Sequence, residues 1–467
     1  MATPDNGDSG TTGFDVLVLG AGSGGYACAL RAAQLGLRVG LVEKGPLGGT
    51  CLHVGCIPTK ALLHAAEVAD SARESAQFGV RATFDGIDMA AVNSYKDGVV
   101  GRLFKGLSGL IASRGITVIE GEGRMTGPRE VTVGGSTYSG RHLVLASGSY
   151  SRTLPGLEID GERVITSEQA LRLDRVPTSV VVLGGGVIGV EFASVWRSFG
   201  ADVTIVEALP RLVAAEDAAS SKALERAFRK RGIAFRTGTA FQSVKTTDTG
   251  VAVTVKGGDV IEAELLLVAV GRGPSTDGLG YAEQGVAMER GFVLADERCR
   301  TNLDGVYAVG DIVPGLQLAH RGFAQGIFVA EDIAGLDPRP IDEAGIPRVT
   351  YSHPELASVG LTEDDAAATY GADAIETLTY DLGGNGRSQI LKTQGFVKLV
   401  RRTDGPVVGI HLAGDRVGEL IGEAQLIYGW EGYPEDVAPL VHAHPTQNEA
   451  LGEAHLALAG KPLHAHS

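Results

Sequence analysis

One segment pattern occurs twice in this chain, and no other feature constrains its fold as strongly. In residues 14–44 an apolar run leads into a glycine-rich turn, a helix-period stretch and a second apolar run that ends at Glu43. Residues 179–207 repeat this order and end at Glu207. Short apolar runs that alternate with a helical stretch indicate strands of a parallel sheet. We therefore predict an α/β fold that contains two β-α-β units.

The turn in each copy has the spacing Gly-x-Gly-x-x-Gly. The glycines are Gly20, Gly22 and Gly25 in the first copy and Gly184, Gly186 and Gly189 in the second. In such a turn the first glycine allows the bend, the second lets the backbone approach a pyrophosphate, and the third packs helix on strand. The helix N-terminus attracts phosphate charge, and the acidic residue that follows binds a ribose hydroxyl. One such motif is a weak signal, whereas two complete copies predict two dinucleotide sites.

The rest of the chain fits around these two units. Residues 142–148, 265–274 and 305–312 are apolar runs that end in or near glycine, as expected for further sheet strands, and the last contains Asp311. From Ile346 onward, residues alternate as in antiparallel strands, and helical patterns follow. The predicted division is a disordered tail at residues 1–13, a first dinucleotide-binding and central domain at 14–152 and 272–345, a second dinucleotide-binding domain at 153–271, and an α+β domain at 346–467.

Composition and charge narrow the functional classes. The formal net charge of −15 argues against a nucleic-acid partner. No apolar run approaches the ~18 residues that span a membrane, and the polar N-terminus lacks the pattern of a signal peptide. The chain has 4 cysteines, too few for a disulfide scaffold. We expect a cytoplasmic protein with no membrane partner and no metal site.

Two of these cysteines, Cys51 and Cys56, lie close together in the segment GGTCLHVGCIPTK. Pro58 suits the first turn of a helix, so the pair is predicted at a helix N-terminus, where the helix dipole favours a thiolate. Lys60, one turn after Cys56, adds positive charge. A disulfide across so short a loop stabilises a fold little. We therefore predict a redox-active pair rather than a structural disulfide.

A disulfide that exchanges with a substrate dithiol requires a base, because only the thiolate is nucleophilic. In the segment HAHPTQNEA, Pro445 is expected to open a helix with His444 at its cap and Glu449 one turn inside. A carboxylate beside an imidazole orients the ring and stabilises its protonated form. His444 is therefore predicted to be the base, and His442 is assigned a structural role.

Together these segments resemble one enzyme family. The segments GAGSGG, GGTCLHVGCIPTKALLHAAE, GGGVIGVE, VAVGRGP, VGDIV and HAHPTQNEALGEAHLALAGKPLHAH follow in the order typical of the flavin-dependent pyridine nucleotide–disulfide oxidoreductases. The resemblance covers essentially the whole chain. It implies two Rossmann-like dinucleotide-binding domains, one for FAD and one for NAD, and a C-terminal α+β dimerisation domain. Within the family the chain is most similar to the dihydrolipoamide-oxidising branch, in its actinobacterial type.

By this resemblance the first dinucleotide is FAD, bound tightly but without a covalent link, and the second is NAD. The residues implied for FAD are Gly20, Gly22, Gly25, Glu43, Lys44, Gly49, Thr50, Lys60, Gly123, Asp311, Ala319 and His320. The residues implied for NAD are Gly184, Gly186, Val187, Ile188, Gly189, Glu191, Glu207 and Gly271. A carboxylate at Glu207 would repel the 2′-phosphate of NADP, which favours NAD.

The reaction implied is oxidation of protein-bound dihydrolipoamide with NAD as the acceptor. The partners implied are the lipoyl domains of 2-oxo acid dehydrogenase complexes. The catalytic residues implied are Cys51, Cys56, His444, Glu449, Lys60 and Glu191, with Glu191 paired to Lys60. The family's base comes from the second subunit, so the resemblance implies a homodimer with active sites shared between subunits.

The same residues argue against other functions that this fold supports. Glutathione-type reductases share the cysteines but use NADPH, which Glu207 disfavours. Mercuric reductases add a C-terminal cysteine pair, and the sequence has none after Cys299. A non-catalytic scaffolding subunit should have lost at least one of the reactive groups, and all are present. His53 stands between the cysteines where the family usually has Asn, so the redox behaviour of the pair stays open.

Overall fold

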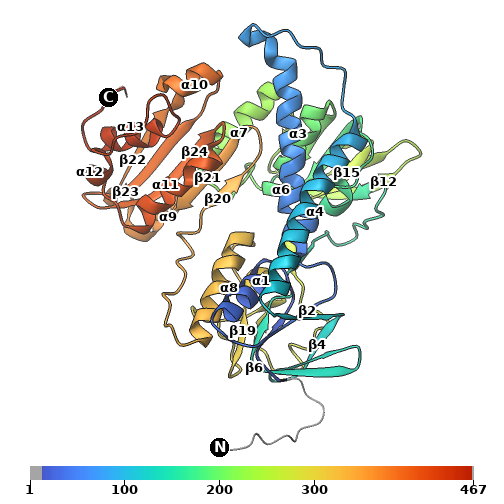
Figure 1. Ribbon diagram of the computed structural model, residues 1–467. Coiled ribbons are helices and arrows are strands. Elements are labelled where there is room, and N and C mark those ends of the chain that lie inside the picture. Colours follow the sequence, from blue (N-terminus) through green and yellow to red (C-terminus); the bar gives the residue numbers. More distant parts are fainter. Residues whose placement is uncertain (1–12, 465–467) are drawn as a thin grey trace, which may run out of the picture. The chain divides into compact units, whose positions relative to one another are not determined.

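The computed structural model describes residues 13–464, which form two compact units. The first unit contains the chain up to Pro58, Ser94–Arg152 and Arg272–Ile341, and the second contains Thr59–Asn93, Thr153–Gly271 and the chain from Asp342 onward. Figure 1 shows the ribbon coloured along the sequence. The prediction of a tail at residues 1–13 is wrong for Gly13, which begins the first strand, and otherwise lies outside the described residues.

The first unit is built on a mixed sheet. Its elements are β1 (Gly13–Leu19), α1 (Ser23–Gln34), β2 (Val39–Glu43), α2 (Gly49–His53), β3 (Thr117–Glu120), β4 (Gly123–Gly127), β5 (Glu130–Val133), β6 (Ser136–Leu145), β7 (Ser149–Ser151), β16 (Arg272–Pro274), β17 (Met288–Glu289), β18 (Phe292–Val293), β19 (Val306–Ala308), η2 (Gly310–Ile312) and α8 (Ala319–Ile333). The order β3-β2-β1-β6 is parallel, and β19 joins the end of β6 in parallel. β5 and β4 continue from β6 as an antiparallel meander.

The described part of the second unit contains one parallel and two antiparallel sheets. Its elements are η1 (Ser75–Phe78), β8 (Val164–Ile165), α5 (Ser167–Ala170), β9 (Ser179–Leu183), α6 (Val187–Phe199), β10 (Asp202–Val206), α7 (Ala218–Arg231), β11 (Ala234–Arg236), β12 (Phe241–Thr246), β13 (Val251–Val255), β14 (Val260–Ala263), β15 (Leu265–Val268), β20 (Arg348–Thr350), β21 (Glu355–Gly360), α9 (Glu363–Tyr370), η3 (Ala372–Ala374), β22 (Ile375–Asp381), η4 (Leu382–Gly384), α10 (Gly386–Leu391), β23 (Phe396–Arg402), β24 (Val407–Gly414), α11 (Val417–Gly429), α12 (Pro434–Val437) and α13 (Glu449–Leu458). The helices α3 (Cys56–Glu74) and α4 (Met89–Ser113) each begin in one unit and end in the other. The parallel sheet has the order β11-β10-β9-β15-β8.

The two parallel sheets have the same winding, which confirms the predicted duplication. In both, the chain runs outward from a central strand and returns to that strand's other side, at β6 and at β15. Gly20 and Gly184 follow the two central strands with φ of 105° and 109°. A Cβ on either glycine would lie 2.3 Å from a carbonyl oxygen of the returning strand's end, that of Ala146 or Ala269. Only glycine fits there, and the open crevice at such a reversal point is where this fold binds its ligand.

Helices α1 and α8 pack side by side in the first unit (Figure 1). Glycine makes the approach possible, because a Cβ on Gly326 would lie 2.2 Å from the carbonyl oxygen of Gly24. A Cβ on Gly322 would lie 3.2 Å from the nitrogen of Gly24. The first turn of α8 therefore lies against the first turn of α1, where the glycine motif ends.

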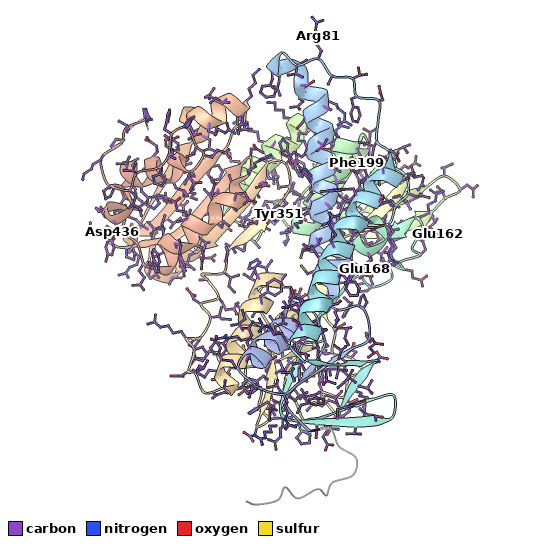
Figure 2. The ribbon with its side chains drawn as sticks, viewed as in Figure 1. Arg81, Glu162, Glu168, Phe199, Tyr351 and Asp436 are labelled. Atoms are coloured by element: carbon purple, nitrogen blue, oxygen red, sulfur yellow. The ribbon has the colours of Figure 1, made fainter. Side chains whose placement is uncertain are left out.

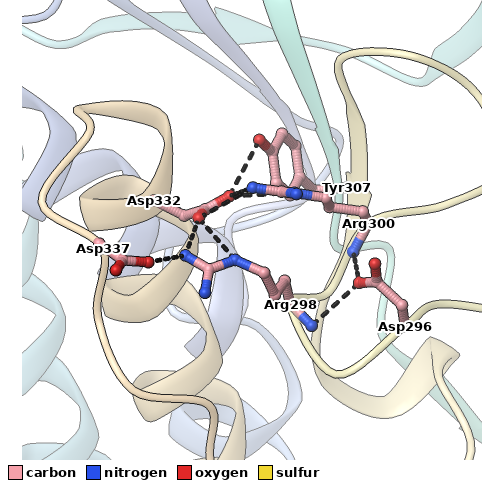
Figure 3. A network of polar contacts seen from close by, with 6 residues as sticks. All are labelled: Asp296, Arg298, Arg300, Tyr307, Asp332 and Asp337. Carbon is pink, nitrogen blue, oxygen red and sulfur yellow. Dashed lines mark hydrogen bonds and ion pairs between the residues drawn. The ribbon is translucent and has the colours of Figure 1, made fainter.

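Asp332 fastens the other end of α8 through a network of arginines (Figure 3). Its carboxylate accepts hydrogen bonds from the guanidinium groups of Arg298 and Arg300 and from the Tyr307 hydroxyl. Burial opposes ionisation of Asp332, but these arginines outweigh it and lower the pKa of the carboxyl group. A second carboxylate, Asp296, accepts from the backbone nitrogens of Arg298 and Arg300. The network holds the end of α8 to the loop that precedes β19.

Residues 59–93 fall in the second unit, although we predicted them within the first domain. Leu62 and Ala66 of α3 are buried in the core formed by β9, α6 and β10, and Met89 packs against the same core. The division of the chain into three domains stays a prediction.

The C-terminal part of the second unit is an α+β structure, as the alternating pattern indicated. Its sheet is antiparallel, in the order β20-β21-β24-β23-β22, and α11 and α13 contact it. Within residues 13–464, no helix combines the length and apolar character that crossing a membrane requires.

Candidate active site

The first glycine turn is closed by the acidic residue predicted from its spacing. Oε2 of Glu43 accepts a hydrogen bond from the backbone nitrogen of Ala21 at 2.7 Å, and Oε1 accepts from that of Gly45 at 2.8 Å. Gly22 caps α1 without a side chain, and a Cβ built on it meets no atom within 4 Å. The helix N-terminus is therefore open to an approaching phosphate.

The second turn repeats this geometry. Glu207 accepts from the backbone nitrogen of Gly185 at 2.5 Å and from that of Leu209 at 2.7 Å. Gly186 caps α6, and a Cβ built on it also meets no atom within 4 Å. In each turn the carboxylate lies beside the helix N-terminus, where a phosphate would bind, so both sites fit a dinucleotide.

Several other residues predicted for FAD gather around the first turn. Gly49 opens α2 so close to the turn that a Cβ on it would lie 2.8 Å from the Cα of Gly22. Thr50 follows in α2, and Ala319 and His320 form the first turn of α8, which packs on α1. These residues come from two helices, α2 and α8, and both helices lie against the start of α1.

The remaining residues predicted for FAD have definite places. Asp311, in η2, accepts a hydrogen bond at 2.5 Å from Ser149 Oγ, which in turn accepts from Arg272 Nε at 2.7 Å. Lys44 follows β2 and pairs with Glu122 at 3.0 Å, and Gly123 begins β4. Ser149 and Arg272 were not predicted, because nothing in the local sequence shows that they support Asp311.

The cysteine pair lies where the sequence predicted, at helix starts. Cys51 lies in α2, and Cys56 begins α3. Nε2 of His53 lies 2.9 Å from the carbonyl oxygen of Leu47, and the His53 ring packs edge-on against Phe104. His53 therefore ties the cysteine helix α2 to the loop that precedes it.

Tyr26 is a further residue near the cysteines that sequence reasoning missed. Burial raises the pKa of the Tyr26 hydroxyl to about 12, and negative charge on Cys51 and Cys56 acts in the same direction. Its position directly after Gly25 of the glycine motif was the available signal. The Tyr26 hydroxyl therefore stays protonated at neutral pH.

In the second unit, Lys60 and Glu191 form an ion pair. The Lys60 Nζ lies 2.9 and 2.8 Å from the two carboxylate oxygens of Glu191, whose side chain is only 3% exposed. The backbone nitrogen of Tyr351 donates to the same carboxylate at 2.9 Å, and Lys60 Nζ lies 4.8 Å from the centre of the Tyr351 ring. Figure 2 labels Tyr351. The pair is fixed by three elements: α3, α6 and the segment before β21.

The other residues predicted for NAD frame the second turn. Val187 and Ile188 begin α6, and Gly189 follows, where a Cβ would lie 1.9 Å from the carbonyl oxygen of Gly184. Gly271 follows β15, and a Cβ built on it meets no atom within 4 Å. The backbone is therefore accessible to a ligand at the glycine turn and again at Gly271, after the returning strand β15.

His444 and Glu449 are in contact, but their local structure differs from the prediction. Nδ1 of His444 lies 2.7 Å from Glu449 Oε1, and the backbone nitrogen of Thr446 donates to Glu449 Oε2 at 2.7 Å. The prediction that Pro445 opens the helix is wrong, because α13 begins at Glu449. The residues before it form a turn, closed by a hydrogen bond of 2.7 Å from Thr446 Oγ1 to the carbonyl oxygen of Ala443.

The carboxylate of Glu449 is held in its ionised form. Partial burial opposes ionisation, but the hydrogen bonds from Thr446 and His444 outweigh it and lower the pKa of Glu449. An ionised Glu449 accepts from Nδ1–H of the ring, which leaves Nε2 of His444 as the basic nitrogen. His444 therefore has the tautomer that a general base requires.

Glu355 is a partly buried acid that sequence reasoning missed. It accepts a hydrogen bond from the backbone nitrogen of Gly418 at 2.9 Å, at the start of α11. Burial raises the pKa of Glu355 to about 7, and the neighbouring acids Asp415 and Glu419 act in the same direction. Its contact with Gly418 joins residues far apart in the sequence, so the local sequence holds no signal for it.

Glu355→Gln is expected to make the protein more stable than wild type at pH 8 but not at pH 4.5. The raised pKa means that the folded state binds a proton more readily than the unfolded state. The wild type therefore loses stability as pH rises from about 4.5 to about 7, at up to about 1.4 kcal/mol per unit of pKa shift. Urea unfolding midpoints at several pH values measure this. Glu262→Gln, an exposed acid of β14 whose charge is not among those acting on Glu355, is the control. An equal Glu355→Gln difference at all pH values would contradict the prediction.

Comparison with known proteins gives matches over nearly the whole chain. The family model described as pyridine nucleotide-disulphide oxidoreductase matches residues 14–326, and the model of that family's dimerisation domain matches residues 346–455. The dihydrolipoyl dehydrogenase of Bacillus subtilis is 40% identical over 97% of this chain and 99% of its own length. That of Chlorobaculum parvum is 42% identical over 96% of this chain and 97% of its own length.

Solved structures of similar proteins agree with the fold. LpdA from Mycobacterium tuberculosis superposes with a TM-score of 0.88 at 27% identity, over 95% of this chain and 99% of that one. The HOCl-induced flavoprotein disulfide reductase RclA from Escherichia coli gives a TM-score of 0.86 at 26% identity, over 96% of this chain and all of that one.

Proposed function

Because the chain belongs to the pyridine nucleotide-disulphide oxidoreductase family, we propose that it oxidises dihydrolipoamide to lipoamide and reduces NAD to NADH. Relatives named dihydrolipoyl dehydrogenase match it at about 40% identity over nearly their full length. The observation that carries the proposal is the joint presence of both dinucleotide turns, the cysteine pair and the His444–Glu449 contact in one chain.

FAD and NAD are the cofactors of this oxidoreductase. FAD, when bound, supplies the two-electron chemistry that connects a dithiol to NAD. In the proposal, FAD is held by Gly20, Gly22, Gly25, Glu43, Lys44, Gly49, Thr50, Lys60, Gly123, Asp311, Ala319 and His320, and NAD by Gly184, Gly186, Val187, Ile188, Gly189, Glu191, Glu207 and Gly271. Two observations support this assignment: the open helix N-termini and the paired geometry of Glu43 and Glu207.

The cysteines carry the exchange with substrate. In the oxidised enzyme they form a disulfide, and a thiolate of dihydrolipoamide attacks Cys51 while Cys56 leaves as a thiolate. The second substrate sulfur then displaces Cys51, so the substrate becomes a disulfide and the enzyme a dithiol. Lys60 and Glu191 contribute a fixed ion pair, whose lysine lies one helical turn after Cys56.

His444 takes the proton from the attacking substrate thiol. Its side chain is 76% exposed in the single chain, whereas Glu449 is 22% exposed and holds the ring from behind. An exposed ring anchored on one side suits a base that serves the active site of a second subunit. We therefore propose that each active site receives His444 of the partner subunit.

The protein forms a homodimer through the family's dimerisation domain. The proposal includes its association with 2-oxo acid dehydrogenase complexes. The proposal includes lipoyl domains as its protein partners. It also includes a cytoplasmic location, because a cysteine pair that cycles between dithiol and disulfide suits a reducing compartment. The domains proposed are residues 14–152 with 272–345, 153–271, and 346–467.

The test is the anaerobic rate of NAD reduction by dihydrolipoamide, with flavin absorbance recorded and NADP in a parallel reaction. Rapid turnover with NAD and little with NADP is expected, because Glu207 repels a 2′-phosphate. An enzyme with reducible flavin but no turnover would overturn the substrate assignment. Equal rates with NADP would overturn the role of Glu207.

A further inference from the structure

One carboxylate holds both ends of the loop that presents His444. Oε1 of Glu423, in α11, lies 2.7 Å from Nε2 of His442, at the start of the loop 442–448. Its other oxygen, Oε2, accepts from Asn448 Nδ2 at 2.5 Å, at the end of the same loop. Asn448 directly precedes Glu449, and His442 lies two residues before His444. Glu423 therefore closes the loop as a clamp.

The surroundings of the loop leave little room for another arrangement. Asn385 Nδ2 donates to the carbonyl oxygen of Thr446 at 2.9 Å, in the middle of the loop. The His442 side chain is only 13% exposed and packs against α13. A Cβ built on Gly452 would lie 2.5 Å from Nδ1 of His442, so the ring fits only because that position is glycine.

We propose that Glu423 is a positioning residue for the reaction with the substrate dithiol, acting through His442 and Asn448 on the His444 loop. This inference rests on the proposed function and extends it to a residue that does not touch the reacting atoms. A base must stand within hydrogen-bond reach of the proton that it takes. A misplacement of about 1 Å can cost about 100-fold in rate, so a loop that carries a base requires fixed ends.

The chemistry of the clamp requires a carboxylate. Both contacts of Glu423 are made to hydrogen-bond donors. Asn448 donates Nδ2–H, and because Nε2 of His442 lies opposite a carboxylate, this nitrogen carries the proton and donates as well. A carboxylate offers two acceptor oxygens, whereas an amide offers one oxygen and one NH₂ group. Glu423→Gln therefore leaves one end of the loop facing a donor, and Glu423→Ala releases both ends.

The experiment compares two rates in the same flavin-loaded enzyme. The first is reduction of the enzyme by dihydrolipoamide, which needs His444. The second is NADH oxidation by ferricyanide, which uses the flavin and NAD sites without the dithiol step. We expect Glu423→Ala to slow the first rate about 10- to 100-fold, Glu423→Gln to slow it less, and neither to change the second.

A double-variant cycle distinguishes positioning from a general structural role. If Glu423 acts through His444, adding Glu423→Ala to His444→Gln causes no further loss, because the group it positions is already gone. A further loss of the same factor in that background would overturn the inference. So would a Glu423→Ala enzyme that reacts with dihydrolipoamide as fast as wild type.

A second variant tests the clamp from the opposite side. Gly452→Ala drives a methyl group against the His442 ring and is expected to slow the dithiol reaction selectively, with Glu423 intact. If Glu423→Ala also loses NADH–ferricyanide turnover, Gly452→Ala becomes the test of the inference. A wild-type dithiol rate in Gly452→Ala would then overturn the inference.

Glu453→Gln is the control, because it alters the separate contact between Glu453 of α13 and His464, and it should leave both rates unchanged. A wild-type enzyme without dihydrolipoamide turnover would overturn the proposed function and this inference together, whereas these variants overturn the inference alone.

Discussion

Cys51→Ser is expected to abolish dihydrolipoamide oxidation, with a loss on the order of 10⁴-fold or more, and to leave NADH–ferricyanide turnover close to wild type. Serine cannot form the disulfide that accepts electrons from the substrate dithiol, so no path remains from substrate to flavin. The fold should survive, because Cys51 lies in the short helix α2 at an intermediate level of burial and not in the core. Steady-state rates of both reactions, measured on enzyme with full flavin content, check this.

Cys56→Ser should have the same effect, since a disulfide needs both sulfurs. Cys28→Ala is the control: Cys28 is fully buried on α1, in the core of the first unit, and is expected to be needed only for packing. Titration of thiols should show that the reduced wild type gains two thiols over the oxidised enzyme and that both Cys51→Ser and Cys56→Ser gain none. Substantial dihydrolipoamide turnover in Cys51→Ser would show that the electrons enter elsewhere.

The features that were predictable from sequence are those that depend on short stretches of chain. The glycine spacing predicted two tight turns, and the structure places Gly20 and Gly184 in the same conformation at the same distance from a returning strand. The position of Pro58 predicted a helix start at the cysteines, and α3 begins at Cys56. In each case, steric limits on one or two residues determine the local backbone.

The features that were missed are one local turn and several contacts between distant segments. The turn before α13 forms because Glu449 takes hydrogen bonds from Thr446 and His444, which the helix signal of Pro445 does not reveal. The clamp joins Glu423 to residues 19 and 25 positions later. Glu355 owes its raised pKa to burial beneath α11. Periodicity and motif spacing contain no information on such long-range pairs.

His444→Gln is expected to slow the reaction of the enzyme with dihydrolipoamide by about 10²- to 10⁴-fold at pH 7, the usual contribution of a general base. Glutamine can still donate a hydrogen bond to Glu449, so the loop should keep its shape while the basic nitrogen is lost. Glu449→Gln should cost less, because the base remains and only its orientation and the stabilisation of its protonated form are weakened. Rapid-mixing measurements of flavin reduction by dihydrolipoamide give these rates directly.

The pH dependence separates loss of a base from loss of structure. An unperturbed thiol has a pKa of about 8.5, so the fraction of substrate already present as thiolate rises about tenfold per pH unit below that value. The deficit of His444→Gln should therefore shrink as pH rises from 7 to 9, because the substrate then ionises without help. A deficit that stays constant over this range would contradict the role of His444 as the base, since misfolding or poor substrate binding does not follow the ionisation of the substrate thiol.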